Sequence, residues 1–379
     1  MSDAAAPVSG GAIQAITMPK WGLAMEEGKV SAWMAEEGAA IESGEEILEI
    51  ETTKITNVFE SPIAGTLRRR VVAEGETVPV GALLGVAAGA DTPDAEIEAF
   101  IADFQANFVV EAADTADAPE AEAITVAGRA LSHLRMGPED GGAIVLVHGF
   151  GGDLNGWLFN QPVLAETQRV YAMDLPGHGR AEKAVGGLDV AALAALLADY
   201  MAAVGTGPAH LVGHSMGGAV ALKLALDNPD LVQRLTLLAP AGLGRELNVD
   251  YVRGFAEAER RKEIKSLLQQ LFADPELVSR DMVNEVQKYK RLDGVNAALR
   301  TLADTLFPDG HQALVMKDRL ESLAMPVQVI WGDEDSIVPP AHAEGLPANV
   351  RLQILEKIGH MPQMEAAGEV NRLIAEFGS

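Results

Sequence analysis

The spacing of apolar residues divides the chain into two parts with different patterns. In the first ninety residues, short apolar runs alternate with polar residues and glycine, as in "EEGAAIESGEEIL" (36–48) and "AEGETVPVGALLG" (73–85). From residue 124 onward, β-branched runs such as "AIVLVHGF" alternate with stretches of helical periodicity such as "DVAALAALLADYMAAVG". The first pattern predicts short strands joined by turns, and the second predicts strands that alternate with helices.

The two early segments are copies of one motif, E-G-x-x-[I/V]-x-x-G-x-x-[I/L]. The repeat preserves two pairs of glycines, Gly38 with Gly75 and Gly44 with Gly81. Glycines at such short spacing mark tight turns between short strands. We therefore expect residues 13–89 to form an all-β domain, a flattened barrel or sandwich, with Lys54 near the point that relates its two halves.

This region resembles the lipoyl/biotinyl carrier family. "MPKWGLAMEEGKV" (18–30) is similar to the family's opening strand, and "EIETTKITNVFESPIAG" (49–65) is similar to its carrier hairpin. In that family the lysine at the hairpin tip is acylated by the cofactor, which implies covalent lipoate on Lys54 and a lipoate ligase as a partner. Thr53 and Ile55 stand where lipoyl domains commonly have Asp and Ala, but the flanking methionines of biotinyl domains are absent, so the resemblance favours lipoate over biotin.

Residues 90–123 have the character of a linker. Five apolar residues at helical spacing predict an amphipathic helix over 94–108: Ile97, Phe100, Ile101, Phe104 and Phe108. We expect this helix to pack on one of its own domains, and docking of a partner protein is the alternative. The acidic, Ala- and Pro-rich stretch that follows predicts a mobile tether.

Residues 124–379 are predicted to form a mostly parallel, doubly wound sheet with helices. Ser215 lies in "GHSMG", directly after an apolar strand and before a helix, where a nucleophilic serine is exposed by a sharp turn. The acids of "WGDED" (331–335) and then His360 follow later strands. The order serine, acid, histidine resembles the α/β-hydrolase superfamily.

The resemblance to that superfamily implies a role for each of these residues. Ser215 would be the nucleophile, His360 the base, and Asp335 the acid that orients the histidine, with Asp333 as the fallback. "HGFGG" (148–152) is similar to the superfamily's oxyanion loop, so the backbone N–H groups of Phe150 and Met216 would form the oxyanion hole.

Residues 241–322 interrupt the strand pattern with helical segments such as "FAEAERRKEIKSLLQQLF" and "VSRDMVNEVQKYKRL", which predicts a helical lid. The whole chain has a net charge of −26, whereas residues 245–319 contain as many basic as acidic side chains. One hypothesis is that Arg260, Arg261 and Lys262 contact the phosphates of coenzyme A. The alternative is a solvated helix face with ion pairs between successive turns.

Composition excludes several classes of function. The strong negative charge argues against nucleic acid or an anionic membrane as a partner. The absence of cysteine excludes disulfides, thiolate catalysis and Cys-zinc sites, and no other metal-ligand spacing appears. No apolar run approaches the length of a membrane span. We expect a cytoplasmic protein.

A carrier domain fused to a serine acyl-transfer domain resembles the acyltransferase component of acetoin dehydrogenase complexes. The resemblance implies a thiamine-diphosphate-dependent acetoin-cleaving partner, a dihydrolipoyl dehydrogenase flavoprotein, and transfer of acetyl to coenzyme A. Two alternatives remain: a serine hydrolase (thioesterase or carboxylesterase) that releases free acid, and a carrier whose second domain is only a scaffold.

Ordinary lipoyl acyltransferases differ from this chain in two ways. Their catalytic core has a His and an Asp-Gly near the C-terminus, and "HMPQMEAAGEV" contains no Asp-Gly. The linker also shows no peripheral subunit-binding domain. Transfer would then rest on the hydrolase fold, and the 94–108 helix is the candidate contact for partner subunits.

Overall fold

The computed structural model of the chain describes residues 13–19, 25, 27–52, 56–108 and 120–377. The residue contacts separate the chain into two compact units, Met1–Ala118 and Pro119–Ser379. The predicted Lys54 and most of the predicted tether lie outside the described residues. Each unit is described below by itself.

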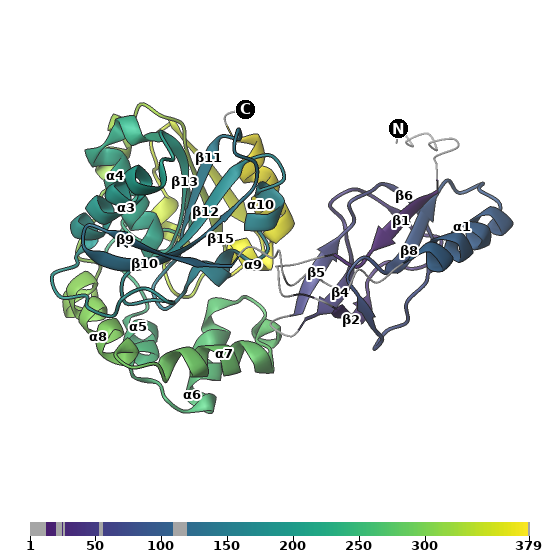
Figure 1. The fold of residues 1–379 in the computed structure, drawn as a ribbon, viewed down its shortest axis with the longest axis horizontal. Helices are drawn as coiled ribbons and strands as arrows, with labels where there is room; N and C mark the ends of the chain where they lie inside the picture. The colour runs from purple at the N-terminus through teal and green to yellow at the C-terminus, as the bar shows by residue number, and fades with distance from the viewer. Residues whose placement is uncertain (1–12, 20–24, 26, 53–55, 109–119, 378–379) are drawn as a thin grey trace. The chain divides into compact units, whose positions relative to one another are not determined.

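The first unit contains two four-stranded antiparallel sheets (Figure 1). One has the order β1-β8-β6-β3 and the other β5-β4-β2-β7. The strands are β1 (Gln14–Thr17), β2 (Glu27–Trp33), β3 (Ala40–Ile41), β4 (Glu46–Glu51), β5 (Thr56–Glu60), β6 (Gly65–Arg70), β7 (Thr77–Pro79) and β8 (Leu83–Ala88). The expected all-β fold is confirmed.

The sequence repeat is a structural repeat in this unit. Strands β3 and β4 correspond in sequence to β7 and β8. Strands β3 and β7 each lie at an edge of one of the two sheets, and β4 and β8 are each the second strand from the opposite edge of one of the sheets. The four repeated glycines have nearly the same left-handed backbone angle, with φ of 89° at Gly38, 87° at Gly44, 87° at Gly75 and 82° at Gly81. Residues with a Cβ rarely adopt this angle, so the repeat of glycines preserves the turns.

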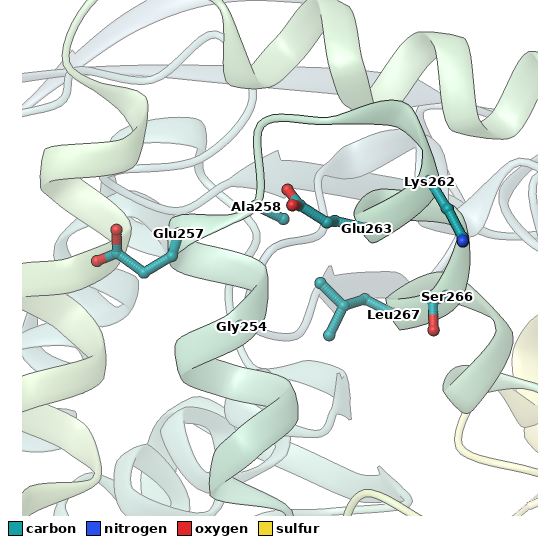
Figure 2. A pocket seen from close by; sticks show the side chains of 7 residues that line it. All are labelled: Gly254, Glu257, Ala258, Lys262, Glu263, Ser266 and Leu267. Carbon is teal, nitrogen blue, oxygen red and sulfur yellow. The ribbon is translucent and has the colours of Figure 1, made fainter.

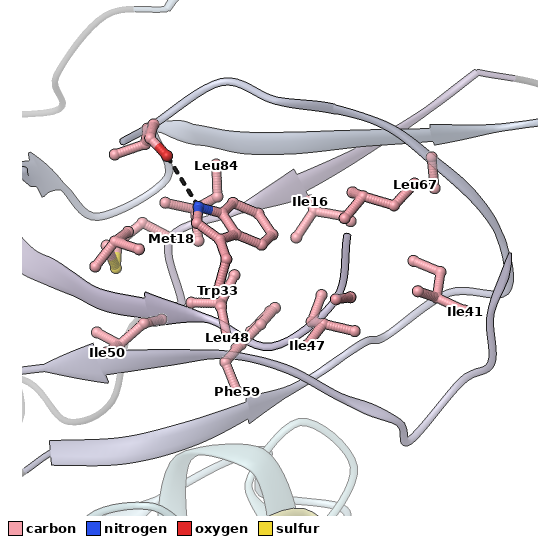
Figure 3. Close-up of a cluster of buried hydrophobic side chains, with 14 of the residues drawn as sticks. Ile16, Met18, Trp33, Ile41, Ile47, Leu48, Ile50, Phe59, Leu67 and Leu84 are labelled. Atoms are coloured by element: carbon pink, nitrogen blue, oxygen red, sulfur yellow. Dashed lines mark hydrogen bonds between the residues drawn. The ribbon is translucent and has the colours of Figure 1, made fainter. Parts of the chain in front are cut away.

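Large apolar side chains fill the space between the two sheets (Figure 3). Ile47 and Leu84, which are equivalent in the repeat, are both fully buried there. Trp33 also packs in this core, and its indole Nε1–H donates to the Val72 carbonyl at 3.0 Å, so its polar atom is not left unpaired. The core therefore fixes the sheets that carry the β4–β5 hairpin.

Helix α1 (Asp94–Asn107) covers one sheet of the same unit. Ile97 is fully buried against Leu83 and Val86 of β8, and Phe100 and Phe104 pack around that contact. The apolar face of α1 is therefore occupied by its own unit, as we preferred. The alternative, in which this face docks a partner subunit, stays a prediction for the part of the face that is only partly buried, at Phe100, Ile101 and Phe104.

The second unit is built on an eight-stranded sheet in the order β16-β15-β14-β13-β11-β12-β10-β9 (Figure 1). Strands β11 to β16 run parallel to one another, while β10 pairs antiparallel with both β12 and β9. The strands are β9 (Glu122–Val126), β10 (Arg129–Met136), β11 (Ala143–Val147), β12 (Arg169–Asp174), β13 (Ala209–His214), β14 (Val232–Leu238), β15 (Val327–Gly332) and β16 (Val350–Leu355). The predicted doubly wound sheet is confirmed.

Helices lie on both faces of this sheet (Figure 1). They are α2 (Gln161–Leu164), α3 (Val190–Val204), α4 (Met216–Asp227), α9 (Pro362–Glu365) and α10 (Ala367–Glu376). Four more helices form the insertion between β14 and β15: α5 (Val249–Glu257), α6 (Arg261–Leu268), α7 (Arg280–Lys290) and α8 (Val295–Leu306). No helix in the described part of the chain is both long and apolar enough to span a membrane.

The segment 255–272 does not form one continuous helix. Helix α5 ends at Glu257, Ala258 and Arg260 are extended, and α6 begins at Arg261. The Glu263 carboxylate accepts a hydrogen bond from the Arg260 N–H at 3.2 Å, which caps a new helix at this point. The periodicity of the sequence could not reveal this break because both halves continue a helical pattern.

Candidate active site

Ser215 lies on the sharp turn between β13 and α4. Its backbone has φ 52° and ψ −118°, a conformation that costs a residue with a side chain of order 1–3 kcal/mol. The surrounding structure holds this turn in place: the Ser215 N–H donates to the Leu238 carbonyl at 3.0 Å, and the Ser215 carbonyl accepts from the Ala241 N–H at 3.0 Å.

The two glycines of the motif permit this turn because the backbone around them is crowded. A Cβ at Gly213 would lie 2.4 Å from the Gly217 carbonyl oxygen, and a Cβ at Gly217 would lie 2.2 Å from the Val147 carbonyl oxygen. Glycine at 213 therefore lets α4 approach β13, and glycine at 217 lets α4 approach the end of β11. The same crowding brings Gly149 to the nucleophile, since a Cβ there would lie 2.9 Å from that of Ser215.

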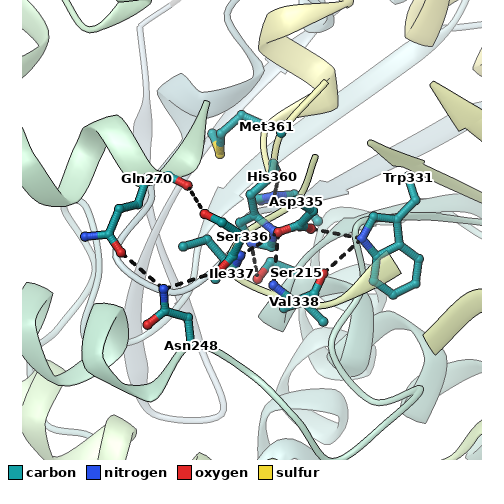
Figure 4. A network of polar contacts seen from close by, with 12 residues as sticks. Ser215, Asn248, Gln270, Trp331, Asp335, Ser336, Ile337, Val338, His360 and Met361 are labelled. Atoms are coloured by element: carbon teal, nitrogen blue, oxygen red, sulfur yellow. Dashed lines mark hydrogen bonds and ion pairs between the residues drawn. The ribbon is translucent and has the colours of Figure 1, made fainter. Parts of the chain in front are cut away.

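Three side chains from separate strand ends meet at this turn (Figure 4). His360 Nε2 lies 2.9 Å from Ser215 Oγ, and His360 Nδ1 lies 2.7 Å from Asp335 Oδ2. All three residues are buried. The arrangement is that of a serine, a base and an acid that fixes the tautomer of the base.

The loop after β15 holds Asp335 in place. Its Oδ1 accepts from the backbone N–H groups of Ile337 at 2.8 Å and Val338 at 3.0 Å, and its Oδ2 accepts from Trp331 Nε1–H at 2.9 Å. Burial alone would raise the pKa of Asp335, but the charge of His360 and these hydrogen bonds outweigh it and lower the pKa below its ordinary value. Asp335 is therefore an anion facing the imidazole.

Asp333, the fallback acid, lies elsewhere. Its Oδ1 accepts from the Lys357 N–H at 2.7 Å, and its own N–H donates to the Leu355 carbonyl at 3.0 Å. These bonds fasten the turn that follows β16. The geometry thus brings Asp335 and not Asp333 to His360.

The two backbone N–H groups expected to form an oxyanion hole belong to Phe150 and Met216. In the described part of the chain, neither donates to a protein acceptor, so both are free to receive a developing oxyanion. The ring of Phe150 packs against His178, Phe255 and Phe307 with ring centroids 6.0 to 6.5 Å apart, and the last two come from the insertion. The oxyanion loop therefore packs directly on lid residues.

The histidines around the site, which we expected to be structural, fasten its loops. His148 Nε2 accepts from the Leu175 N–H, and His178 Nε2 accepts from the Gly151 N–H, both at 3.0 Å. His214 Nε2 lies 2.8 Å from the His360 carbonyl oxygen. Burial, together with the charge of His360, lowers the pKa of His214 to about 3, so its ring stays neutral beside the base.

Comparison with known proteins places both units in families. A model of the alpha/beta hydrolase fold matches residues 142–367, and a model described as "Biotin-requiring enzyme" matches residues 14–86. The dihydrolipoyllysine-residue acetyltransferase component of the acetoin cleaving system of Pseudomonas putida is 45% identical over 96% of this chain and 98% of its own length. The component of the same description from Cupriavidus necator is 44% identical over 95% and 96%.

The chain belongs to this family of dihydrolipoyllysine-residue acetyltransferase components. Solved structures agree on the fold of the second unit. A meta-cleavage product hydrolase from Pseudomonas fluorescens superimposes with a TM-score of 0.62 at 22% identity, over 68% of this chain and 96% of its own. A carboxylesterase from Bacillus subtilis gives a TM-score of 0.61 at 20% identity, over 68% and 91%.

The carrier lysine expected in this family, Lys54, lies outside the described residues. The strands on either side of it are described: β4 and β5 pair antiparallel, and Glu51 opposite Thr56 is their last pair. The described strands therefore end immediately on either side of the segment that contains Lys54. This position fits a residue that carries a covalently attached group.

The three basic residues proposed for coenzyme A have different surroundings. Arg260 is 85% exposed, and Arg261 donates to the Asn284 side chain at 2.7 Å. Lys262 lines a hollow of about 550 Å³ between α5 and α6 (Figure 2), together with Gly254, Glu257, Ala258, Glu263, Ser266 and Leu267. Two acidic residues and one basic residue line this hollow, a balance of charge that does not favour phosphate.

Several functional residues could not be found from the sequence. Trp331 donates to Asp335, and Glu365 accepts from backbone N–H groups on both sides of His360. Trp331 stands four residues before Asp335, but no periodicity marks it. Among the described residues, no group of three or more metal-binding side chains occurs.

Proposed function

We propose that this chain passes an acetyl group from a thioester to the thiol of coenzyme A through an acyl-enzyme on Ser215. The observation that carries the proposal is the continuous hydrogen-bonded set of Ser215, His360 and Asp335 in a chain that also contains a carrier unit. Family membership supplies the acetyl group as the cargo.

In the first half-reaction, Ser215 Oγ attacks the thioester carbonyl carbon while His360 Nε2 takes the hydroxyl proton. Asp335 stabilises the imidazolium that forms. The carbonyl oxygen becomes an oxyanion that the N–H groups of Phe150 and Met216 receive, each such donor contributing roughly 10²–10³ in rate. The C–S bond then breaks, His360 returns the proton to the leaving sulfur, and Ser215 carries the acetyl ester.

The second half-reaction reverses these roles. The thiol of coenzyme A gives its proton to His360 and attacks the acyl carbon. When the tetrahedral intermediate collapses, the ester C–O bond breaks and His360 protonates Ser215 Oγ. Acetyl-CoA leaves and the enzyme is restored.

We propose Lys54 as the point of attachment of lipoate. When attached, the lipoyl group supplies a thiol that holds an acyl group as a thioester on a long arm. The match to the carrier family model and the pairing of β4 with β5, the strands that precede and follow Lys54 in the sequence, support this assignment. The transfer step itself requires only the residues of the second unit.

Exclusion of water decides whether this chemistry gives acetyl-CoA or acetate. Phe255 of α5 and Phe307, which follows α8, pack on the oxyanion-loop residue Phe150. An apolar cover of this kind limits the access of water to the acyl-serine. The same triad without such protection would act as the serine hydrolase that is the alternative.

The partners that we propose are an enzyme that generates the acyl thioester by cleaving acetoin with thiamine diphosphate, and a flavoprotein that reoxidises the dihydrolipoyl group. The family name, component of an acetoin cleaving system, supports their existence. A lipoate ligase is needed to load Lys54. Because Ile97 of α1 is buried in its own unit, we expect partner contacts mainly at other surfaces.

The test follows the acetyl group by intact mass. The lipoylated chain, acetylated on its arm, is mixed with coenzyme A, and a Ser215→Ala variant is treated identically. The proposal expects acetyl-CoA from the wild type and at least a 10³-fold slower reaction from the variant. Release of acetate at one rate with or without coenzyme A would instead establish a hydrolase.

A further inference from the structure

The carboxylate of Glu365, at the end of α9, accepts hydrogen bonds from three backbone N–H groups. Gly359 N–H lies 3.0 Å from Oε1 and 3.1 Å from Oε2, and Met361 N–H lies 3.2 Å from Oε1. These two residues flank His360. The third donor, the Ala273 N–H at 2.8 Å from Oε2, comes from the lid insertion. One side chain therefore joins the lid to the loop of the base.

The lid segment 269–273, here called the lid arm, also contacts both catalytic loops directly. The His360 N–H donates to the Leu271 carbonyl at 2.8 Å. On the side of the acid, Ser336 Oγ–H donates to the Gln270 carbonyl at 2.7 Å (Figure 4). Asn248 Nδ2–H donates to the Gln270 side chain at 3.1 Å and to the Ser336 carbonyl at 3.2 Å.

The lid arm approaches the histidine loop closely enough to exclude a side chain. A Cβ at Gly359 would lie 2.7 Å from the Ala273 nitrogen and 2.8 Å from the Leu271 carbonyl oxygen. On its other side, the His360 carbonyl is held by His214. The backbone of His360 is thus fixed between the lid arm and the strand that leads to Ser215.

We infer that Glu365 is a positioning residue for acyl transfer, and that its bonds to Ala273, Gly359 and Met361 place the His360 ring correctly only while the lid arm is docked. The inference rests on the proposed function of Ser215 and His360. Its consequence is that closure of the lid and activation of the serine are one event. An enzyme of this kind would form its reactive serine only when the site is covered against water.

The ionisation of Glu365 gives this coupling a pH dependence. Burial raises the pKa of Glu365 to about 7, against the three N–H donors and the charge of His360, which lower it. His360 is the titratable side chain that acts on it, and the lid arm contributes the backbone of Ala273. Protonation replaces an acceptor oxygen with a hydroxyl. The hydrogen bonds between Glu365 and the backbone on either side of His360 therefore weaken as pH falls below about 7.

The experiment measures the rate at which a fluorophosphonate inactivates Ser215 in the full-length chain. This probe reports activation of the serine without coenzyme A or an acylated arm. Glu365→Gln keeps the size of the side chain but turns an NH₂ group toward the N–H donors, and we expect it to slow inactivation about 10- to 100-fold at pH 8. The matched control, Glu369→Gln, removes a partly exposed partner of Arg372 and should react like the wild type.

The pH profile separates positioning from a general loss of structure. The Gln variant resembles the protonated wild type, so the ratio of wild-type to variant rates should fall toward one below about pH 7. A ratio that stays constant from pH 5.5 to pH 8.5 would overturn the inference, as would a Gln variant within twofold of the wild type at pH 8.

A second variant tests the lid side of the coupling. Ala273→Pro removes the N–H that Glu365 accepts, and the preceding residue Phe272 already has the extended backbone that a following proline requires. We expect it to slow inactivation in the same direction, and the double variant with Glu365→Gln to be less than multiplicative. If the double variant slows inactivation by the product of the two single effects, the coupling between Glu365 and the lid arm is overturned, even if one variant folds poorly. A wild type whose Ser215 does not react would instead refute the proposed function.

Discussion

Both units of this chain have exposed ion pairs, and among the described residues the catalytic unit also has a buried one. In the carrier unit, the described ion pairs lie at the surface: Lys29 and Glu51 are 45% and 44% exposed, and Arg68, Arg69 and Arg70 pair with exposed carboxylates. In the catalytic unit, the His360–Asp335 pair is 3% and 0% exposed. Exposed pairs contribute little to stability, whereas an unpaired member of a buried pair is costly.

The two units also differ in their content of histidine. All eight histidines of the chain follow residue 132, and none occurs in the carrier sequence. Burial lowers the pKa of His210 to about 3, with a smaller effect from Arg234, and the pKa of His214 falls equally far. The carrier unit is thus an apolar core with a charged surface, while the catalytic unit encloses groups that titrate. We therefore expect acid to destabilise mainly the catalytic unit, and loss of buried apolar volume to destabilise the carrier unit.

The largest expected effect comes from the buried acid. Asp335→Asn keeps the shape of the side chain but removes the charge that selects the His360 tautomer, and we expect kcat for acetyl transfer to fall by about 10⁴. The Trp331 and backbone donors remain to hold the loop. The measurement is single-turnover transfer from the acetylated arm to coenzyme A.

Asp333→Asn is the matched control for that change. Asp333 accepts only from the Lys357 N–H among the described residues, on the far side of the turn. We expect its kcat to remain within about threefold of the wild type. Equal losses in the two variants would contradict the assignment of the acid.

Acid should destabilise the catalytic unit selectively. His210 and His214 have folded pKa values of about 3 and an ordinary value of 6.5, so the unfolded chain binds more protons between these limits. Stability is therefore lost as pH falls below 6.5. By linkage, the pair should cost about 4 kcal/mol at pH 5 relative to pH 7.5.

Hydrogen exchange resolved by peptide can follow both units in one sample. Protection in the strands of the catalytic sheet should fall between pH 7.5 and pH 5 after correction for the intrinsic exchange rate. Protection in β4 and β8 should change much less. An equal loss of protection in the carrier strands would contradict the expectation that acid destabilises the catalytic unit selectively.

The carrier unit should instead respond to loss of apolar volume. Ile97→Ala removes a fully buried side chain from the contact between α1 and β8, and we expect the carrier unit to lose about 3 kcal/mol of unfolding free energy. Triad activity toward a small thioester should not change. Denaturant unfolding measures the first effect, and any large fall in that activity would show that α1 serves the second unit.

Local patterns in the sequence were sufficient to predict the architecture. The glycine repeat predicted turns that now have nearly equal left-handed angles, and the β-branched runs predicted the parallel sheet. These features depend on neighbours in the chain, which a sequence displays directly. The position of Ser215 between a strand and a helix is a feature of the same kind.

The finer parts of the site depend on residues far apart in the chain. The sequence favoured Asp335 over Asp333 as the acid, but only the structure shows how the N–H groups of Ile337 and Val338 hold Asp335 beside His360. Glu365 lies 92 residues from its lid donor. Contacts made across such separations are set by tertiary packing, and no periodicity in the sequence reports them.

The smallest expected effect concerns the exposed pair beside the carrier hairpin. Lys29 Nζ lies 2.8 Å from Glu51 Oε2, across the pairing of β2 with β4. A double-mutant cycle with Lys29→Ala and Glu51→Ala should give a coupling of about 0.5 kcal/mol in the unfolding of the carrier unit, falling further in 1 M salt. A coupling above about 2 kcal/mol would mean that water screens this pair far less than its exposure implies, and the contrast with the buried pair of the catalytic unit would no longer hold.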